Sequence, residues 1–487
     1  MPLFIVRHQH DAQRCPAADP YHAAQLLNHL SRPNLRKHGL SMKGEAVARG
    51  EHTLYMIVEA GHEALVRDYM APFDMAGSVD VYPASTCAGV ASRGGCDAHL
   101  VPSDTPALVL DPEEACQQAI DDGLIVHRAH PLNGETSVPA LIGGLVMPNA
   151  KFYVRNHFQI PKLDLANWRL SVGGLVERRL NLTWRDISNM PSESRLVTLE
   201  CAGNGRAQLT PRVSGEQWNF GAVSTAEWTG VPLAEVLDRA GLHSSGRYIV
   251  FRGADAGEVE GHSGSITFER SLDLDQVREA APLLAYAMNG EALPFQHGFP
   301  LRLIVPSWYA VASVKWLTGI EVVDRPFEGY YQTEKYQFER EVSGRIEREP
   351  LKFQRVRSLI TEPEGEACVP CGELAVRGVA WSGADPIARV ELSVNGKKWQ
   401  EARLLGEAKR HSWQRWEFIT RVDQPEQYRI RSRATDTFGR TQPESAEWNR
   451  PGYCNNVVHE VAITTCRGAV NLEKSAERTS WAAVSLP

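Results

Sequence analysis

Several features are scarce in this chain, and each scarcity narrows the class of protein that it can be. No apolar run in the 487 residues approaches the roughly 20 that span a bilayer, so no membrane partner is expected. The formal net charge of −7 gives no electrostatic reason to expect nucleic acid. The N-terminus, MPLFIVRHQHDAQRC, lacks the basic and apolar regions of an export signal, which leaves the cytoplasm as the expected compartment.

Cysteine is also sparse. The nine cysteines are odd in number and scattered, which is not typical of a secreted disulfide framework. Cys368 and Cys371 form a C-x-x-C without a second pair, so we interpret them as a turn or an incidental pair in preference to a zinc or redox site. No C-x-x-C-H is present, and the chain therefore carries no covalent c-type haem.

What is present indicates several domains, because 487 residues are too many for one hydrophobic core. Short alternating strands and helical patterns near the N-terminus predict a small α+β sandwich with one exposed sheet face. The C-terminal third alternates like the strands of a β-sandwich. The expected divisions are 1–98 (α+β accessory domain), 99–123 (linker), 124–340 (a long domain with glycine-punctuated strands), 341–470 (β-sandwich) and 471–487 (tail).

The stretch VTLECAGNGR, residues 197–206, holds the most informative cysteine. Cys201 follows a predicted strand and precedes two glycines that allow close backbone approach. Arg206 would favour the thiolate, which is the form that ligates metals. No partner at zinc-site spacing stands nearby, and one thiolate alone cannot hold a metal. The remaining ligands would have to come from an organic cofactor or from distant residues.

This stretch resembles the molybdenum-ligating loop of the sulfite oxidase family, and four further blocks follow the family's order. They are FYVRNH (152–157), WNFGAVSTAEWTGVPL (218–233), LLAYAMNGEALP (283–294) and FQHGFPLRLIVPSWYAVASVKWLTGIEV (295–322). The resemblance covers about residues 126–336, and it extends more weakly through a C-terminal segment, EWNRPGYCNNVVHEV. It implies a mixed α/β molybdopterin domain followed by an immunoglobulin-like sandwich that usually makes a homodimer.

The resemblance implies roles for individual residues. Cys201 would be the protein's ligand to molybdenum. The residues implied in holding molybdopterin are Phe152, Tyr153, Arg155, Asn156, His157, Cys201, Asp255, His297, Arg302, Ser313, Val314 and Lys315. Arginine and lysine suit the cofactor's phosphate because they supply charge-assisted hydrogen bonds. Arg302 could otherwise lie on a solvated strand edge.

The implied reaction is oxidation of sulfite to sulfate by oxo transfer at a Cys-ligated molybdenum. Arg155, Arg206 and Arg450 match three anion-binding arginines, with Trp218 and Tyr336 as their neighbours. Preorganised positive charge in a partly dry pocket strengthens oxyanion binding. Two departures concern this pocket: Lys335 precedes the tyrosine where many relatives have aspartate, and Gly205 stands where animal members have a second arginine. Both bear on substrate identity.

Alternatives remain at this point. The same cofactor could oxidise a protein-bound sulfane or reduce S-oxides or N-oxides, although reductive relatives typically lack the C-terminal sandwich. A cofactor-free binding protein on the same fold is the alternative from a different class. Because no haem domain is recognisable, an external electron acceptor such as a cytochrome is implied.

The N-terminal domain lies outside the core of the family. It resembles small ferredoxin-like domains that are sometimes found alone in bacteria. His8 and His10 lie on one face of a predicted strand, and with Cys15 they could share a metal ion. Further ligand types in this domain are His52, Cys87 and Cys96. A polar sheet face without metal would show the same pattern.

Overall fold

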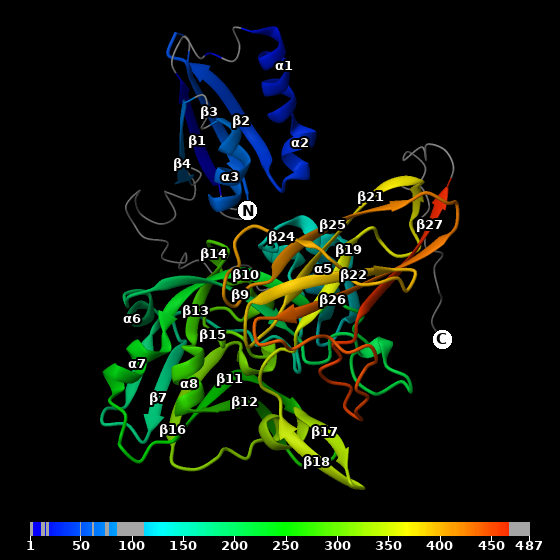
Figure 1. Cartoon of the computed structure of the whole chain (residues 1–487). Helices are drawn as coiled ribbons and strands as arrows, with labels where there is room; N and C mark the ends of the chain where they lie inside the picture. Colours follow the sequence, from blue (N-terminus) through cyan, green and yellow to red (C-terminus); the bar gives the residue numbers. More distant parts are fainter. Residues whose placement is uncertain are drawn as a thin grey trace.

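The computed structural model describes residues 3–10, 15, 19–48, 50–60, 63–73, 77–84 and 112–466, which form three folded units (Figure 1). The predicted tail 471–487, Cys87 and Cys96 lie outside the described residues. Among the described helices, none is both long and apolar enough to cross a membrane.

The N-terminal unit has the ferredoxin-like order of elements. It comprises β1 (Leu3–His10), α1 (Pro20–His29), α2 (Arg32–Lys37), β2 (Ser41–Ala48), β3 (Thr53–Glu59), α3 (Glu63–Met70) and β4 (Gly77–Ala84). Its antiparallel sheet has the strand order β2-β3-β1-β4. This arrangement confirms the predicted α+β sandwich.

The alternation of side chains along β1 explains why helices cover only one face of this sheet. Phe4 and Val6 are buried, together with Val66 and Tyr69 of α3. The opposite face exposes Ile5 and its cross-strand neighbours Ile57 and Tyr82, in addition to Tyr55. The predicted exposed sheet face is therefore present, and it is apolar.

A helix occupies part of the segment expected to be a linker. α5 (Pro112–Asp121) packs against β5 (Leu124–Arg128), and Cys116, Ala119 and Leu124 are buried between them. The prolines and acids of this segment suggested a linker, but the two small buried residues three positions apart give the helix an apolar side. The described part of the second unit thus begins at α5.

The second unit carries the candidate active site and is built on two sheets around one large core. The first sheet contains β14 (Glu291–Ala292), β13 (Leu283–Met288), β10 (Val223–Pro232) and β9 (Glu193–Glu200) in that order, with β15 (Arg302–Ile304) paired to β13. The second contains β12 (Ser265–Asp273), β11 (Tyr248–Glu258), β16 (Leu317–Val323), β7 (Arg169–Gly174) and β8 (Leu180–Thr183). Three short helices, α6 (Trp184–Ser188), α7 (Leu233–Ala240) and α8 (Leu274–Ala280), complete it.

A hairpin of β17 (Gln337–Val342) and β18 (Arg345–Pro350) leads into the C-terminal sandwich. One sheet has the order β19 (Arg357–Glu362), β21 (Gly372–Trp381), β25 (Gln414–Val422) and β24 (Arg403–Leu405). The other has the order β20 (Cys368–Pro370), β27 (His459–Cys466), β26 (Gln427–Asp436), β22 (Ile387–Val394) and β23 (Gln400–Glu401). The sandwich expected from the alternating pattern is confirmed, and it has its own core.

The last described strand of the sandwich is fixed by a disulfide that the sequence analysis did not predict. Cys368 of β20 bonds to Cys466 of β27, 98 residues along the chain, while Cys371 keeps a free thiol. The C-x-x-C is therefore not a bonded pair. Disulfides persist mainly in oxidising compartments, so this bond weighs against the cytoplasmic location expected from the N-terminus.

A buried histidine should make the sandwich sensitive to acid. His459 is 5% exposed, and its Nδ1 accepts the backbone N–H of Ile360 at 3.0 Å. Burial, aided by repulsion from Arg357, lowers the pKa of His459 to about 3. Because this pKa lies below its unfolded value, the neutral ring stabilises the fold above about pH 6.5, and this stability is lost as the pH falls.

We expect His459 alone to cost about 2–3 kcal/mol of unfolding free energy between pH 7 and pH 4.5. Denaturant unfolding at both pH values, for the wild type and for His459→Asn, measures this term. The asparagine Oδ1 can accept the same N–H but does not titrate. A stability difference between the two proteins that does not change with pH would contradict the prediction.

Candidate active site

Cys201 lies at the carboxyl end of β9, where the chain leaves the sheet. Its side chain is buried, and its backbone N–H donates to Ala222 O at 2.9 Å. Burial raises the pKa of the Cys201 thiol, and the positive charges of Arg155 and Arg206 oppose this shift. The thiol is therefore protonated at neutral pH, and a metal ion that bound here would have to displace the proton.

The glycines after Cys201 are required by close contacts of the loop. Gly205 has φ +81°, and a Cβ there would lie 2.6 Å from a guanidinium nitrogen of Arg357. A Cβ at Gly203 would lie 2.6 Å from the guanidinium of Arg206. The backbone can therefore bring the thiol and the Arg206 guanidinium together, as the spacing of residues 201–206 suggested.

A buried ion pair anchors this loop to the C-terminal sandwich. Glu200 and Arg357 have side chains that are 3% and 2% exposed, and Arg357 Nη1 donates to Glu200 Oε1 at 3.0 Å. The same nitrogen donates to Asn204 O at 3.2 Å, and Trp381 Nε1 donates to Glu200 Oε2 at 2.9 Å. The position of the Cys201 loop thus depends on β19 and β21 of the neighbouring domain.

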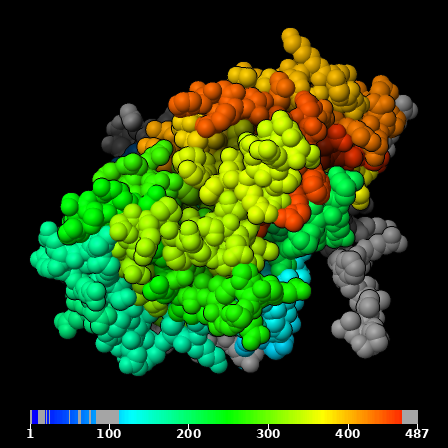
Figure 2. All heavy atoms as spheres, turned by 90° about the horizontal axis from the view of Figure 1, so that it is seen from below, coloured from blue at the N-terminus to red at the C-terminus, as the bar shows by residue number. Residues whose placement is uncertain are grey.

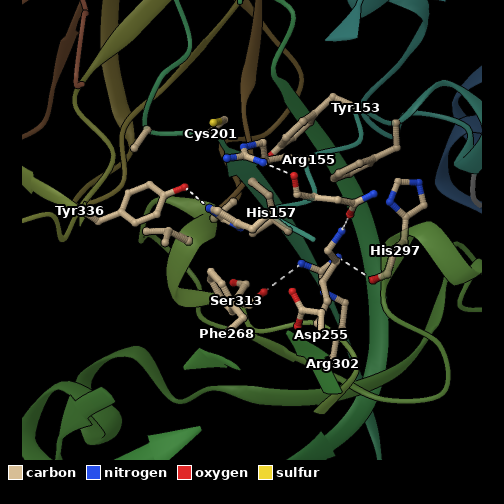
Figure 3. A pocket seen from close by; sticks show the side chains of 17 residues that line it. Tyr153, Arg155, His157, Cys201, Asp255, Phe268, His297, Arg302, Ser313 and Tyr336 are labelled. Atoms are coloured by element: carbon tan, nitrogen blue, oxygen red, sulfur yellow. Dashed lines mark hydrogen bonds between the residues drawn. The ribbon is translucent and has the colours of Figure 1, made fainter. Parts of the chain in front are cut away.

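A deep pocket opens beside the Cys201 thiol (Figure 3). Its lining comes mainly from β9, β11, β12 and β15 and from the loops after β6 (Asn133–Thr136) and before β16. The lining residues are Phe152, Tyr153, Arg155, Asn156, His157, Leu199, Cys201, Ala202, Asp255, Phe268, His297, Arg302, Ala310, Val311, Ser313, Lys315 and Tyr336. The structure therefore brings together all of the predicted cofactor-binding residues except Val314.

Two buried polar atoms in this pocket indicate a polar ligand. Arg302 Nε and Asp255 Oδ1 are both buried and have no hydrogen-bond partner in the structure. Arg302 is held by the carbonyls of His297 and Ser313, at 2.8 and 3.3 Å. It therefore lines the pocket and is no solvated strand edge. Burial lowers the pKa of Arg302 to about 10, which still leaves it charged at neutral pH.

The charge balance of the pocket favours an anion. Lys315 and Arg155 join Arg302 as cationic lining residues, against the single carboxyl of Asp255. Burial, followed by repulsion from Arg302, lowers the pKa of Lys315 well below its usual range. A phosphate placed among these residues would compensate the buried positive charge. The residues present therefore fit the phosphorylated pterin that the sequence predicts.

His157 and Tyr336 point toward one another across the pocket (Figure 3). His157 Nε2 and Tyr336 Oη are 2.6 Å apart. Burial and the nearby Arg155 lower the pKa of His157 well below its usual range, while burial raises the pKa of Tyr336. Both groups are therefore neutral at neutral pH, and the tautomer of the imidazole sets which of them donates the hydrogen bond.

A second pocket meets the first at Arg155, Cys201 and Tyr336 and opens to the surface. Figure 2 shows this side of the molecule, where the yellow-green segment of about residues 330–350 lies against the orange-red C-terminal segment. Arg206 is 6% exposed and donates to Pro451 O and Glu216 O. This second pocket, called the mouth below, also contains Lys335, whose side chain is exposed. The pKa of Lys335 is lowered because its ammonium group is partly desolvated and is repelled by Arg206.

Three predicted residues lie differently from expectation. Arg450 reaches the mouth, but its side chain is 72% exposed and makes two hydrogen bonds to Glu339, at 3.0 and 2.8 Å, so its charge is already paired. Trp218 is fully buried behind the loop against His127 and lines neither pocket. Val314 is fully buried, and its carbonyl accepts the N–H of Leu303 at 2.8 Å.

The sequence analysis missed Tyr453, which lines the mouth, and Arg270, a buried arginine near Tyr336 and Tyr453. Tyr453 stacks on Tyr336 with ring centroids 5.2 Å apart, and it lies 5.2 Å from the Arg206 guanidinium. Buried Arg270 donates to Tyr331 O, and its pKa, lowered by burial to about 10, is partly restored by Tyr336 and Tyr453. The quoted segment EWNRPGYCNN contains Tyr453, but its role depends on a contact between two domains.

Comparisons with known proteins agree with this geometry. A family described as "Oxidoreductase molybdopterin binding domain" matches residues 157–331, and a "Mo-co oxidoreductase dimerisation domain" matches residues 350–466. Mitochondrial sulfite oxidase of Mus musculus is 33% identical over 389 residues, covering 73% of this chain and 70% of that protein. An NADH nitrate reductase of Brassica napus is 31% identical over 376 residues, covering 69% of this chain and 40% of its own length. The crystal structure of the sulfane dehydrogenase SoxCD from Paracoccus pantotrophus matches with a TM-score of 0.61 and 30% identity, covering 68% of this chain and 84% of that one.

Proposed function

Because this chain belongs to the sulfite oxidase family of molybdopterin oxidoreductases, we propose that it oxidises sulfite to sulfate and passes the electrons to an external acceptor. The observation that supports this most is the meeting of two pockets at Cys201: the residues of one fit the cofactor, and the other is a mouth in which Arg155 and Lys335 make no ion pair with the carboxylates that the structure describes. The family's cofactor is a molybdenum–molybdopterin, and when bound it accepts two electrons and exchanges an oxygen atom with the substrate.

The residues that would hold the cofactor divide by chemistry. Cys201 would supply the thiolate, and Arg302, Lys315 and His297, which line the same pocket, would hold the phosphate. Asp255 offers its unpaired carboxyl oxygen to the ring N–H groups of a pterin. Because these groups are held by buried backbone contacts, the site is preorganised.

The mouth would bind and orient the oxyanion. Arg155 and Arg206 place two guanidinium groups beside the thiol, and Lys335 adds a third positive charge at the opening. Tyr336 keeps its proton and can donate it in a hydrogen bond to a sulfite oxygen. Overall, sulfite and water yield sulfate, two protons and two electrons, and the electrons leave to a separate acceptor such as a cytochrome.

Assembly as a homodimer is supported by the dimerisation family of the C-terminal sandwich. The intact Cys201 loop and the family membership favour an enzyme over the cofactor-free binding protein that the sequence had left open.

The presence of the sandwich was expected to favour oxidation. However, the match to the nitrate reductase runs over 376 residues, more than the 124–340 domain contains, so the sandwich does not distinguish oxidative from reductive relatives.

A second candidate function is oxidation of a protein-bound sulfane, which the structural similarity to SoxCD favours. The two candidates differ in what must enter the mouth, because a sulfane carried by a protein needs a wider opening than a free oxyanion.

Steady-state assays of the purified protein with ferricyanide should give turnover with sulfite. Turnover only with a thiol-bound persulfide, or only in the direction of nitrate or sulfoxide reduction, would replace the proposal.

Lys335→Gln tests the role of the mouth. Removing this exposed charge should raise the KM for sulfite by about 3- to 10-fold and weaken its dependence on salt, with little change in kcat. Lys398→Gln, an exposed lysine on the turn between β22 and β23, is the matched control and should leave both constants unchanged. An unchanged KM for Lys335→Gln would show that cationic groups deeper in the pocket, and not Lys335, bind the substrate anion.

A further inference from the structure

A cluster of metal-ligand side chains lies at one end of the N-terminal sheet, remote from the molybdenum site. His10 ends β1, Cys15 follows it, and His52 occupies the turn between β2 and β3. Their ligand atoms all lie within 4.8 Å of one another, and all three residues are half-buried. This end of the sheet points away from the other two domains (Figure 1).

The backbone holds two of the three side chains in place. The pairing of β1 with β3 sets Gln9 opposite Thr53, and the next residue, His10, donates its N–H to His52 O at 3.1 Å. His52 has φ +49°, a left-handed conformation that is uncommon for a residue other than glycine. Strain of this kind is often found at binding sites. The two imidazole rings meet edge to face, with centroids 5.4 Å apart.

His8 fixes which nitrogen of His10 can bind a metal. His8 Nδ1 lies 3.2 Å from Ser78 O, which can only accept, so the proton of His8 is on Nδ1. His8 Nε2 therefore accepts from His10 Nδ1, 3.3 Å away. This leaves the lone pair of His10 on Nε2, the atom that is buried in the cluster. Metal-ligating histidines characteristically donate their other ring N–H in this way.

From this arrangement we propose that His10, Cys15 and His52 form a second metal site that takes a zinc-like transition-metal ion. Two imidazoles and a thiolate suit a cation of borderline softness and suit Mg²⁺ or Ca²⁺ poorly. Tetrahedral bonds to zinc separate ligand atoms by ~3.5 Å, so the cluster closes on an ion by small side-chain rotations. Three protein ligands leave the fourth position open to water or to another ligand.

This site differs from the one that the sequence suggested. His8 was grouped with His10 and Cys15 because both histidines share a face of the strand. In the structure His8 is 2% exposed, stacks on His10 with centroids 5.2 Å apart, and serves as the partner that orients it. His52 takes its place as a ligand, although 42 residues separate it from His10.

Zinc binding to the full-length, molybdenum-loaded protein tests the proposal. After removal of loosely bound ions, competition with a chromophoric chelator should show one zinc per chain. Cys15→Ser and His52→Gln should each weaken zinc binding by at least about 10-fold, and His8→Phe by about 10-fold through loss of orientation. Cobalt should give a sulfur-to-metal charge-transfer band that disappears in Cys15→Ser.

Two controls separate this site from other thiols and imidazoles. His22→Gln and Cys371→Ser, which alter residues outside the cluster, should bind zinc like the wild type. The same titration on Cys201→Ser excludes zinc bound at an empty molybdenum ligand. Molybdenum content and sulfite turnover should stay unchanged in Cys15→Ser. No zinc bound by folded wild type, or equal binding by wild type and Cys15→Ser, would overturn the proposal.

Discussion

Replacing Cys201 with serine should abolish turnover, with a loss of at least about 100-fold for sulfite. Cys201 is the only cysteine among the lining residues of the two pockets that meet at its thiol. A serine hydroxyl stays protonated at neutral pH and is a harder ligand than a thiolate, so it does not replace the sulfur. Sulfite-dependent reduction of ferricyanide measures the loss, and X-ray absorption reports the missing sulfur neighbour of molybdenum.

Cys371→Ser is the matched control, because this free cysteine lies in the sandwich, next to the disulfide. It should retain wild-type activity. The pterin extracted from Cys201→Ser should remain near one per chain, since the phosphate-facing residues are untouched. Wild-type turnover in Cys201→Ser would show that this thiol does not ligate the metal.

Replacing Arg357 with methionine should destabilise the protein by about 3–5 kcal/mol, because it removes the positive charge that is paired with the buried carboxylate of Glu200. The substitution should also disturb the active site, because Arg357 donates a hydrogen bond to the carbonyl of Asn204 in the Cys201 loop. Denaturant unfolding measures the free energy of unfolding, and the metal content measures the state of the loop. We expect both to fall together.

A double-mutant cycle separates the ion pair from simple packing. Glu200→Gln combined with Arg357→Met removes both charges and should recover much of the stability lost in Arg357→Met. Arg357→Lys keeps the charge but loses the planar guanidinium that lies over the Phe220 ring, so its stability should fall between those of the other two variants. Burial raises the pKa of Glu200. A loss below about 1 kcal/mol in Arg357→Met would mean that Glu200 is protonated in the folded protein.

The residues of the cofactor pocket could be predicted because they lie in blocks of continuous sequence. Asn156 and His157 share one such block, and Arg302, Ser313 and Lys315 share another, so recognising the block places the residue. Contacts between domains carry no comparable local signal. Arg450 was expected to bind the substrate, but its nearest carboxylate is Glu339, 111 residues away.

The N-terminal unit shows the same distinction. Its strands were predicted from alternation, which is a property of neighbouring residues. The pairing of His10 with His52 follows from sheet register, and the Cys368–Cys466 disulfide joins residues 98 positions apart. Both contacts join residues that are far apart in the sequence, so the spacing of residues along the chain predicts neither of them. The helix of residues 112–121 was missed because its apolar side consists of only two small residues.

The division of the active site into two pockets has a consequence for how such enzymes diverge. Among the residues that the structure describes, only Arg155, Cys201 and Tyr336 line both pockets. The mouth also contains Lys335, an exposed residue that can be exchanged without disturbing buried contacts. A lineage can therefore acquire a new substrate through a few surface substitutions while the cofactor chamber is inherited unchanged. Sulfite, nitrate and sulfane enzymes could arise from one scaffold by this route, and transplanted mouth residues are the natural starting point for laboratory evolution.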